Sequence, residues 1–185
     1  PSTNTIDKFA FASDGNATDV GDLTVARYAT AGQSSSDSGY NSGGNPTTNI
    51  IDKFSFSVNG NATDVGDLTL SRKAASGSSS SDSGYTAGGH DGNATNTIDK
   101  FAFASDGNAT DVGDCTVSKD ERAGQSSSVN GYSSGGQPET NVIDKFSFAS
   151  DANATDSGDL TLARHGASGQ SSSASGYTSG GYGGG

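Results

Sequence analysis

The chain has 185 residues, which suits one compact domain or one run of repeats. Its 21 acidic and 10 basic side chains give a formal charge of -11, which argues against a nucleic-acid-binding protein, because phosphate contacts need clustered Lys and Arg. The same charge argues against docking on an anionic membrane surface, and the sequence has no run of about 18 apolar residues that would predict a membrane-spanning helix.

The cysteine content and the start of the chain bear on its location. The single cysteine, Cys115, excludes an intrachain disulfide. The first four residues lack the basic start and the apolar core of a signal peptide, so we expect no export by that route.

The chain begins with the segments of a unit that then recurs. Residues 4–11 alternate with apolar side chains on both faces, which predicts a strand that is partly buried on each side. Residues 14–19 have turn chemistry, and residues 21–27 read as a short alternating strand. Residues 32–44 predict two short strands of small side chains, joined by a hairpin at Asp37 and Ser38.

Two strings recur four times, 45, 47 and 45 residues apart. Ile-Asp-Lys-Phe and Gly-Tyr-x-x-Gly-Gly each occur once per copy, which divides a single repeat domain, 1–185, into units of about 1–45, 46–90, 91–137 and 138–185. Leu, Ile, Val and Phe make up only about 14% of the chain, a composition typical of disordered segments. The regular order of the residues nevertheless predicts a folded repeat protein.

The unit predicts an all-β protein. Glycine is too frequent for helices, and no segment has a sustained 3.6-residue apolar period. A four-stranded sheet of about 46 residues cannot bury its faces alone, so the copies must pack against one another. Radial packing gives a β-propeller of four four-stranded blades, and linear packing gives the alternative, an open repeat array or solenoid. We expect the paired phenylalanines of each unit to fill the space between neighbouring sheets.

The double glycine after Tyr and the later Leu-x-x-x-Arg string resemble the kelch repeat. Residues 176–181 match its glycine signature and residues 68–72 match the tail of its fourth strand, although the chain lacks the tryptophan found there. The resemblance implies kelch-like propeller blades and covers nearly the whole chain. In the kelch arrangement the last blade takes its outer strands from the N-terminus and its inner strands from the C-terminus, which would close a ring within one chain.

The strings Asn-Ala-Thr-Asp-Val-Gly-Asp-Leu-Thr and Gly-Tyr-x-x-Gly-Gly also resemble repeat proteins of marine bacteriophages, including cyanophages. This resemblance implies a structural protein of the virion, such as part of a tail fibre used in host attachment. Its partners would be other virion proteins or copies of itself, and a glycan on the host surface. The alternative is a purely architectural subunit that self-assembles into a fibre or decorates a particle and binds no small ligand.

One turn of each unit has oxygen-bearing side chains at spacings that suit Ca²⁺. Positions 1, 3, 5 and 9 of this loop are the candidate ligands, and a hairpin turn capped by Asx side chains is the competing interpretation. The candidate metal residues are Asp14, Asn16, Thr18, Asp22, Asn61, Asp67, Asp106, Asn108, Asp114, Asp151, Asn153 and Asp159. Calcium is the only cofactor that the sequence indicates.

The repeated tyrosines are candidates for glycan contact, because aromatic rings beside polar groups suit sugars. They are Tyr40, Tyr85, Tyr132 and Tyr177. The competing interpretation is that each ring packs against the neighbouring blade. Cys115 takes the position held by leucine in the other copies, which indicates a small buried side chain.

The chain has no recurring arrangement of Ser, His and Asp and no Gly-x-Ser-x-Gly elbow, so we expect no enzyme. The Asp and Lys of Ile-Asp-Lys-Phe are adjacent on a strand and therefore face opposite sides. We expect each to form a structural ion pair, either with a neighbouring blade or with Arg27, Arg72 or Arg164. The third copy departs from this arginine pattern, because it has Lys119 at the equivalent position and Arg122 three residues later.

Overall fold

The computed structural model describes residues 1–184, and these residues form strands, turns and loops without a helix. The sixteen strands are β1 (Thr5–Lys8), β2 (Thr18–Asp22), β3 (Ala31–Ser34), β4 (Ser38–Ser42), β5 (Ile50–Ser55), β6 (Thr63–Asp67), β7 (Ser76–Ser79), β8 (Ser83–Ala87), β9 (Thr97–Ala102), β10 (Thr110–Asp114), β11 (Ala123–Ser126), β12 (Asn130–Ser134), β13 (Thr140–Ser147), β14 (Thr155–Arg164), β15 (Ser168–Ser171) and β16 (Gly176–Ser179). The all-β prediction is confirmed. Within the same residues no helix is long and apolar enough to cross a membrane.

Twelve strands form three antiparallel sheets of four strands each, which we call the first (β3–β6), second (β7–β10) and third (β11–β14) sheets. Each sheet joins the small-residue strands of one unit to the Ile-Asp-Lys-Phe strand and the following strand of the next unit. The remaining strands form a first hairpin (β1–β2) and a last hairpin (β15–β16). The prediction of four-stranded antiparallel sheets is therefore confirmed.

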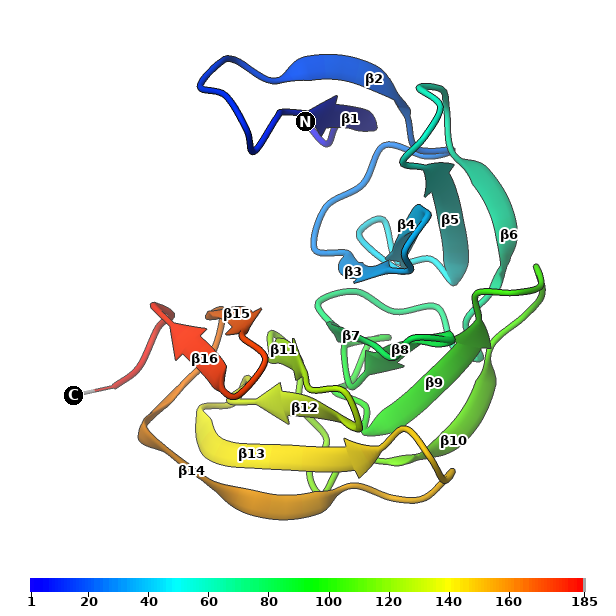
Figure 1. Cartoon of the computed structure of the whole chain (residues 1–185). Helices are drawn as coiled ribbons and strands as arrows, with labels where there is room; N and C mark the ends of the chain where they lie inside the picture. Colours follow the sequence, from blue (N-terminus) through cyan, green and yellow to red (C-terminus); the bar gives the residue numbers. More distant parts are fainter. Residues whose placement is uncertain (185) are drawn as a thin grey trace.

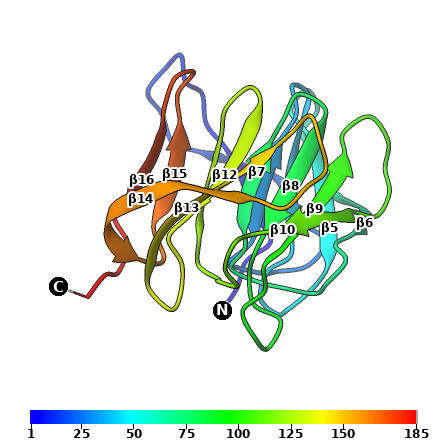
Figure 2. The same cartoon turned by 90° about the horizontal axis from the view of Figure 1, so that it is seen from below.

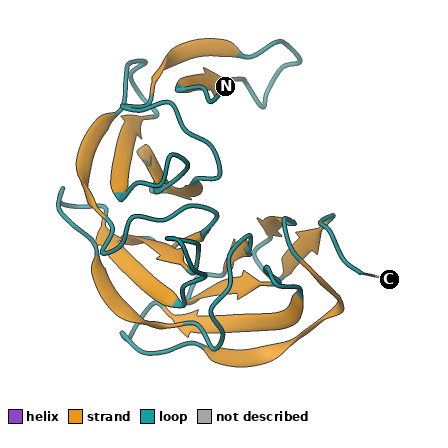
Figure 3. Cartoon of the chain, turned by 180° about the vertical axis from the view of Figure 1, so that it is seen from behind, coloured by secondary structure: helices purple, strands orange, loops and turns teal. Residues whose placement is uncertain are grey.

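The sheets follow one another around an arc. Figure 1 shows β3, β7, β11 and β15 on the inner side of the arc and β2, β6, β10 and β14 on its outer side. Figure 2 shows the sheets from below, standing side by side, with connecting loops at their upper and lower edges. Figure 3 shows the arc from behind, with the first and last hairpins at its two ends.

The two hairpins are separate, unlike the expected closure of one blade by both ends of the chain. Within residues 1–184, β1 pairs only with β2 and β16 pairs only with β15. Each hairpin is held by its neighbour along the arc. The backbone N–H of Ala62 donates to the carbonyl of Asp22 (2.8 Å), and the Gln125 amide donates to the Thr178 hydroxyl (2.9 Å).

The second strand of each unit begins earlier than the sequence predicted. Thr18 and Asp19, expected in a turn, already belong to β2, which ends at Asp22. The chain leaves the sheet there because Thr24 turns towards the next sheet. Its backbone N–H and its hydroxyl both donate to Asp52, at 3.0 and 2.7 Å.

The inner strands lie in backbone contact, which explains the glycine at one position of each of them. A Cβ atom at Gly77 would lie 2.2 Å from the carbonyl oxygen of Gly32, and one at Gly124 would lie 2.1 Å from that of Gly77. Gly169 meets Gly124 in the same way. A side chain at these positions would separate the sheets, so only glycine permits this approach.

The prediction that the paired phenylalanines pack between neighbouring sheets is confirmed for two of the four pairs, Phe101/Phe103 and Phe146/Phe148, whereas Phe9, Phe11 and Phe56 are exposed. Tyr40 of the first sheet stacks on Phe103 of the second, with ring centroids 4.8 Å apart, and packs at 5.5 Å against Phe101. Tyr85 repeats both contacts with the third sheet. Two core clusters result, one containing Ile51 and Leu68 and the other containing Ile98 and Cys115 in the equivalent positions.

We predict that Phe101→Ala lowers the free energy of unfolding by about 3–5 kcal/mol, because the ring is 3% exposed and fills the space between two sheets. Phe11→Ala is the matched control, since that ring is 98% exposed, and its effect should stay within about 0.5 kcal/mol. Urea unfolding followed by circular dichroism at low protein concentration measures both. Equal effects of the two changes would contradict this packing.

Candidate functional site

The most distinctive polar site of the chain is a buried carboxylate that recurs in every four-stranded sheet. In the second sheet, Asp99 accepts a bond from Arg72 at 2.9 Å, and both side chains are fully buried. Asp99 also accepts bonds from the backbone N–H (3.0 Å) and the hydroxyl (2.6 Å) of Thr69. Three donors therefore satisfy one carboxylate that water cannot reach.

The arginine of this site lies between β6 and β7 and bonds to two strands of the second sheet. Arg72 donates to the carbonyl of Thr86 on β8 (2.9 Å) and to that of Thr97 on β9 (3.3 Å), in addition to Asp99. Burial lowers the pKa of the Arg72 guanidinium, and the charge of Asp99 opposes that shift. A guanidinium keeps its proton in proteins, so the pair stays ionic. Arg27 and Asp52 form the same pair in the first sheet, so the ion pairs predicted for Arg27 and Arg72 are confirmed, whereas Arg164 pairs with no carboxylate among residues 1–184.

The third sheet reaches the same arrangement from a different sequence position. Asp144 pairs with Arg122, not with a residue at the position of Lys119. Lys119 instead donates to the carbonyl of Pro138 at the surface (2.8 Å). The sequence marked this segment as a departure from the pattern but did not identify Arg122 as the replacement. The carbonyl contact of Arg122 with Ser133 (3.0 Å) matches that of Arg72 with Thr86.

The lysines of the repeated string make the contacts between sheets. Lys53 pairs with Asp106 and Lys100 with Asp151, each at 2.9 Å and each partly exposed. Lys8 makes the corresponding contact with Asn59. Exposed pairs of this kind contribute little to stability but help to set the register between neighbours.

The candidate calcium loops use their oxygens mainly for contacts between repeats. Asn61, Asn108 and Asn153 each accept a bond from the backbone N–H of the preceding repeat, donated by Asp22, Asp67 and Asp114 respectively, at 3.0–3.1 Å.

The remaining candidate ligands do not converge. Asp14, Asn16 and Asp159 are exposed, and the hydroxyl of Thr18 donates to the carbonyl of Lys8. No group of three or more acidic, His or Cys side chains that would hold a metal occurs in the described part of the chain. Calcium binding stays a prediction.

The four repeated tyrosines lie in different surroundings. Tyr40 and Tyr85 are buried, which raises the pKa of both phenols, and their rings pack on phenylalanines of the next sheet. Tyr132 is half-buried, and Tyr177 is 56% exposed. Only the last two rings are open to a ligand such as a glycan, and that role stays a prediction.

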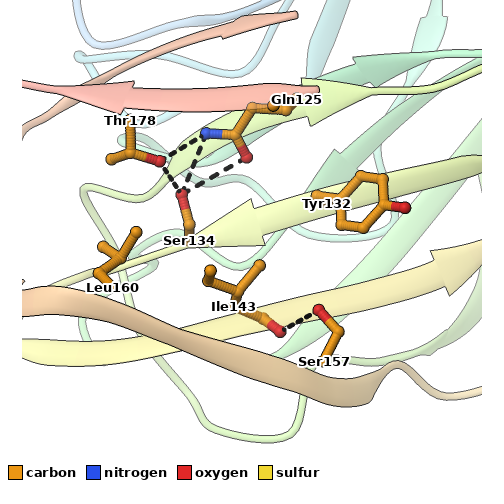
Figure 4. Close-up of a pocket in the computed structure, with 8 residues that line it drawn as sticks. Gln125, Tyr132, Ser134, Ile143, Ser157, Leu160 and Thr178 are labelled. Atoms are coloured by element: carbon orange, nitrogen blue, oxygen red, sulfur yellow. Dashed lines mark hydrogen bonds between the residues drawn. The ribbon is translucent and has the colours of Figure 1, made fainter. Parts of the chain in front are cut away.

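A hollow of about 310 Å³ lies between the third sheet and the last hairpin. Tyr132, Ile143, Leu160 and Gly176 form much of its apolar lining. Figure 4 shows Gln125, Ser134 and Thr178 joined by hydrogen bonds along one side of it. A second hollow of about 390 Å³ lies at the first hairpin, lined mainly by apolar side chains such as Ile6, Phe9, Phe11, Val20, Phe54 and Phe56.

Comparison with protein-family models and with curated proteins finds no match to this chain.

We predict that Arg72→Met lowers the free energy of unfolding by about 3–5 kcal/mol, because it leaves the buried carboxylate of Asp99 without its counter-charge. Lys100→Met removes a partly exposed pair and should cost less than about 1 kcal/mol. Urea denaturation of both variants tests the difference. A small effect of the arginine change would mean that the pair does not support the fold.

We predict that Cys115 does not react with a thiol reagent such as DTNB at pH 8 while the protein is folded. The side chain is 2% exposed, and burial raises the pKa of its thiol to about 12. Thiolate is the reacting form, so both effects suppress the reaction. One equivalent should react in 8 M urea, and rapid stoichiometric reaction of the native protein would contradict the buried position.

Proposed function

We propose that the chain is a non-enzymatic structural module of the β-propeller type, made of kelch-like repeats, and that it serves in a bacteriophage virion appendage such as a tail fibre. The observation that carries the structural role is the use made of the recurring polar groups. In each four-stranded sheet the Asp, Thr and Arg of the repeat satisfy one another in a buried site. The lysine and asparagine positions hold one repeat against the next.

The propeller type is supported by the arrangement of the strands. Three sheets of four antiparallel strands follow one another around an arc, with one strand of each on the inner side (Figure 1). The inner strands contact one another through glycine backbones, which suits the crowded axis of a radial array. The virion setting rests on the resemblance to repeat proteins of marine bacteriophages.

A host-surface glycan is the ligand that this setting favours. Tyr177 and Tyr182 expose their rings near the C-terminal end of the arc, at 56% and 78%. Exposed aromatic rings beside hydroxyl-rich strands are suited to stacking on sugars.

The second candidate is a purely architectural subunit that assembles with copies of itself. It is favoured by the two hairpins at the ends of the arc, since each is half of a four-stranded sheet. Unpaired strand edges are sites at which another chain can add strands.

We predict that antibodies against the chain label the tails or appendages of intact phage particles from the source culture in immunogold electron microscopy. Labelling confined to lysed cells, with bare particles, would contradict a virion role.

A glycan array probed with the purified chain, in calcium and in EDTA, separates the two candidates. Binding that Tyr177→Ala abolishes and that Tyr40→Phe leaves intact supports host attachment. The absence of binding to any glycan on the array, together with immunogold labelling of the particles, supports the architectural subunit.

A further inference from the structure

The two ends of the arc present opposite halves of the contact that joins neighbouring sheets. Arg164, the last residue of β14, stands four residues after Leu160 as Arg72 stands four after Leu68, and it donates to the carbonyl of Thr178 on β16 (2.8 Å) as Arg72 does to that of Thr86. Among residues 1–184, however, no carboxylate pairs with Arg164. Arg164 is therefore placed as Arg72 is, and only the carboxylate that would accept its second bond is missing.

The missing acid is present at the other end of the chain. Asp7 of β1 occupies the position of Asp52, Asp99 and Asp144 in the repeated string, yet it is exposed while those three are fully buried. No arginine contacts Asp7 in the described residues. Arg164 therefore matches Arg72 but has no carboxylate partner, and Asp7 matches Asp99 but has no arginine partner.

The two hollows match aromatic rings from the opposite ends. In the complete sheets Phe101 lies over Gly84 and packs against Tyr40, next to Ile51 and Leu68. The hollow at the last hairpin is lined by the equivalents of these residues and lacks only the ring, for which Phe9, 61% exposed, is the counterpart.

The hollow at the first hairpin has the surroundings of a repeated tyrosine but contains no tyrosine. It is lined by Ile6, Phe54 and Phe56, the equivalents of residues that surround Tyr40 in the complete pair of sheets. Tyr177 is the counterpart of Tyr40 and is 56% exposed. Each end therefore carries a ring that fits the hollow at the other end.

We propose that β16 of one copy pairs antiparallel with β1 of a second copy of this chain, which completes a four-stranded sheet β15–β16–β1–β2 across the two molecules. The register follows the complete sheets, in which Gly39 faces Phe54 and Asn41 faces Asp52. Gly176 then faces Phe9, and Thr178 faces Asp7. Asp7 then pairs with Arg164, and Thr161 stands at the sequence position of Thr69, whose N–H and hydroxyl bind Asp99.

A second copy is the partner because both hairpins are already fixed in place. The first hairpin is bonded to the first sheet through Asn61 and Thr24, and the last hairpin is bonded to the third sheet through Gln125 and Ser126. They stand at the two ends of an open arc (Figure 3). Closure within one chain would break these contacts, whereas a second copy docks without disturbing them.

The test is the mass of the purified chain by sedimentation velocity over a range of concentrations. This inference rests on the proposed architectural role, but the measurement needs neither virions nor glycans, so a failure of either proposal is seen separately. We expect assemblies of two or more copies whose population rises with concentration. Asp7→Ala should weaken association roughly 100-fold, because it removes the acid from a buried ion pair. Asp82→Ala, an exposed acid in a hairpin turn, is the charge-matched control and should leave association unchanged.

A charge exchange sharpens the result. Asp7→Arg and Arg164→Asp should each be monomeric alone, because like charges then meet at the contact. Their equimolar mixture should associate again as alternating copies, because the charge pair is exchanged at one contact and the native Asp7–Arg164 pair is kept at the other. Circular dichroism checks that each variant is folded. Wild-type protein that stays monomeric at all concentrations would overturn the proposal. So would an Asp7→Ala variant that melts at a lower temperature without any change in mass, since that result means closure within one chain.

Discussion

The buried carboxylate of each sheet is the constraint on which the rest of the structure depends. Removing an ionised side chain from water costs several kcal/mol, so the site is tolerable only when every donor is in place. For Asp52 the donors come from separate parts of the chain, Thr24 after the preceding outer strand and Arg27 before the inner strand. The site at Asp52 therefore ties the first sheet to the connection that leads from the first hairpin, residues 23–30, and so links neighbouring repeats.

This dependence explains how a chain so poor in large apolar residues stays ordered. Each pair of neighbouring sheets shares a small cluster, such as Tyr40, Ile51, Leu68 and Phe101, and the rest of the contact is polar or backbone. Stability in such arrays is the sum of unit and neighbour contributions, and both core clusters of this chain lie between neighbouring sheets. Glycine and serine on the inner strands serve the same end, because they let backbones meet where side chains would keep them apart.

Much of the architecture could be predicted from the repeats. Strings such as Ile-Asp-Lys-Phe located the strands, and the paired phenylalanines indicated packing between sheets, because both are local patterns. The end of β2 at Asp22 could not be predicted, since Thr24 leaves the strand to reach an aspartate 28 positions away. Arg122 was missed for a similar reason. The position that matters is defined by Asp144 in space and not by the spacing from Cys115 along the chain. The separation of the two hairpins depends on the rotation between sheets, on which a repeat period carries no information.

The rotation between sheets also determines which assembly forms when copies of the chain join end to end. A head-to-tail contact closes into a ring when the rotation divides the circle and continues as a helical filament when it does not. The inner strands set the rotation, because Gly32, Gly77 and Gly124 hold successive backbones together with no side chain between them. The middle strands are spaced by larger groups, the tyrosine rings of β4 and β8 and the phenylalanine rings of β9 and β13. The outer strands again meet the next repeat through backbone, since a Cβ atom at Gly21 or Gly66 would lie 2.2 Å from the carbonyl oxygen of Gly60 or Gly107. The same glycines that permit contact between repeats within the chain therefore determine the symmetry available to copies that join at its ends.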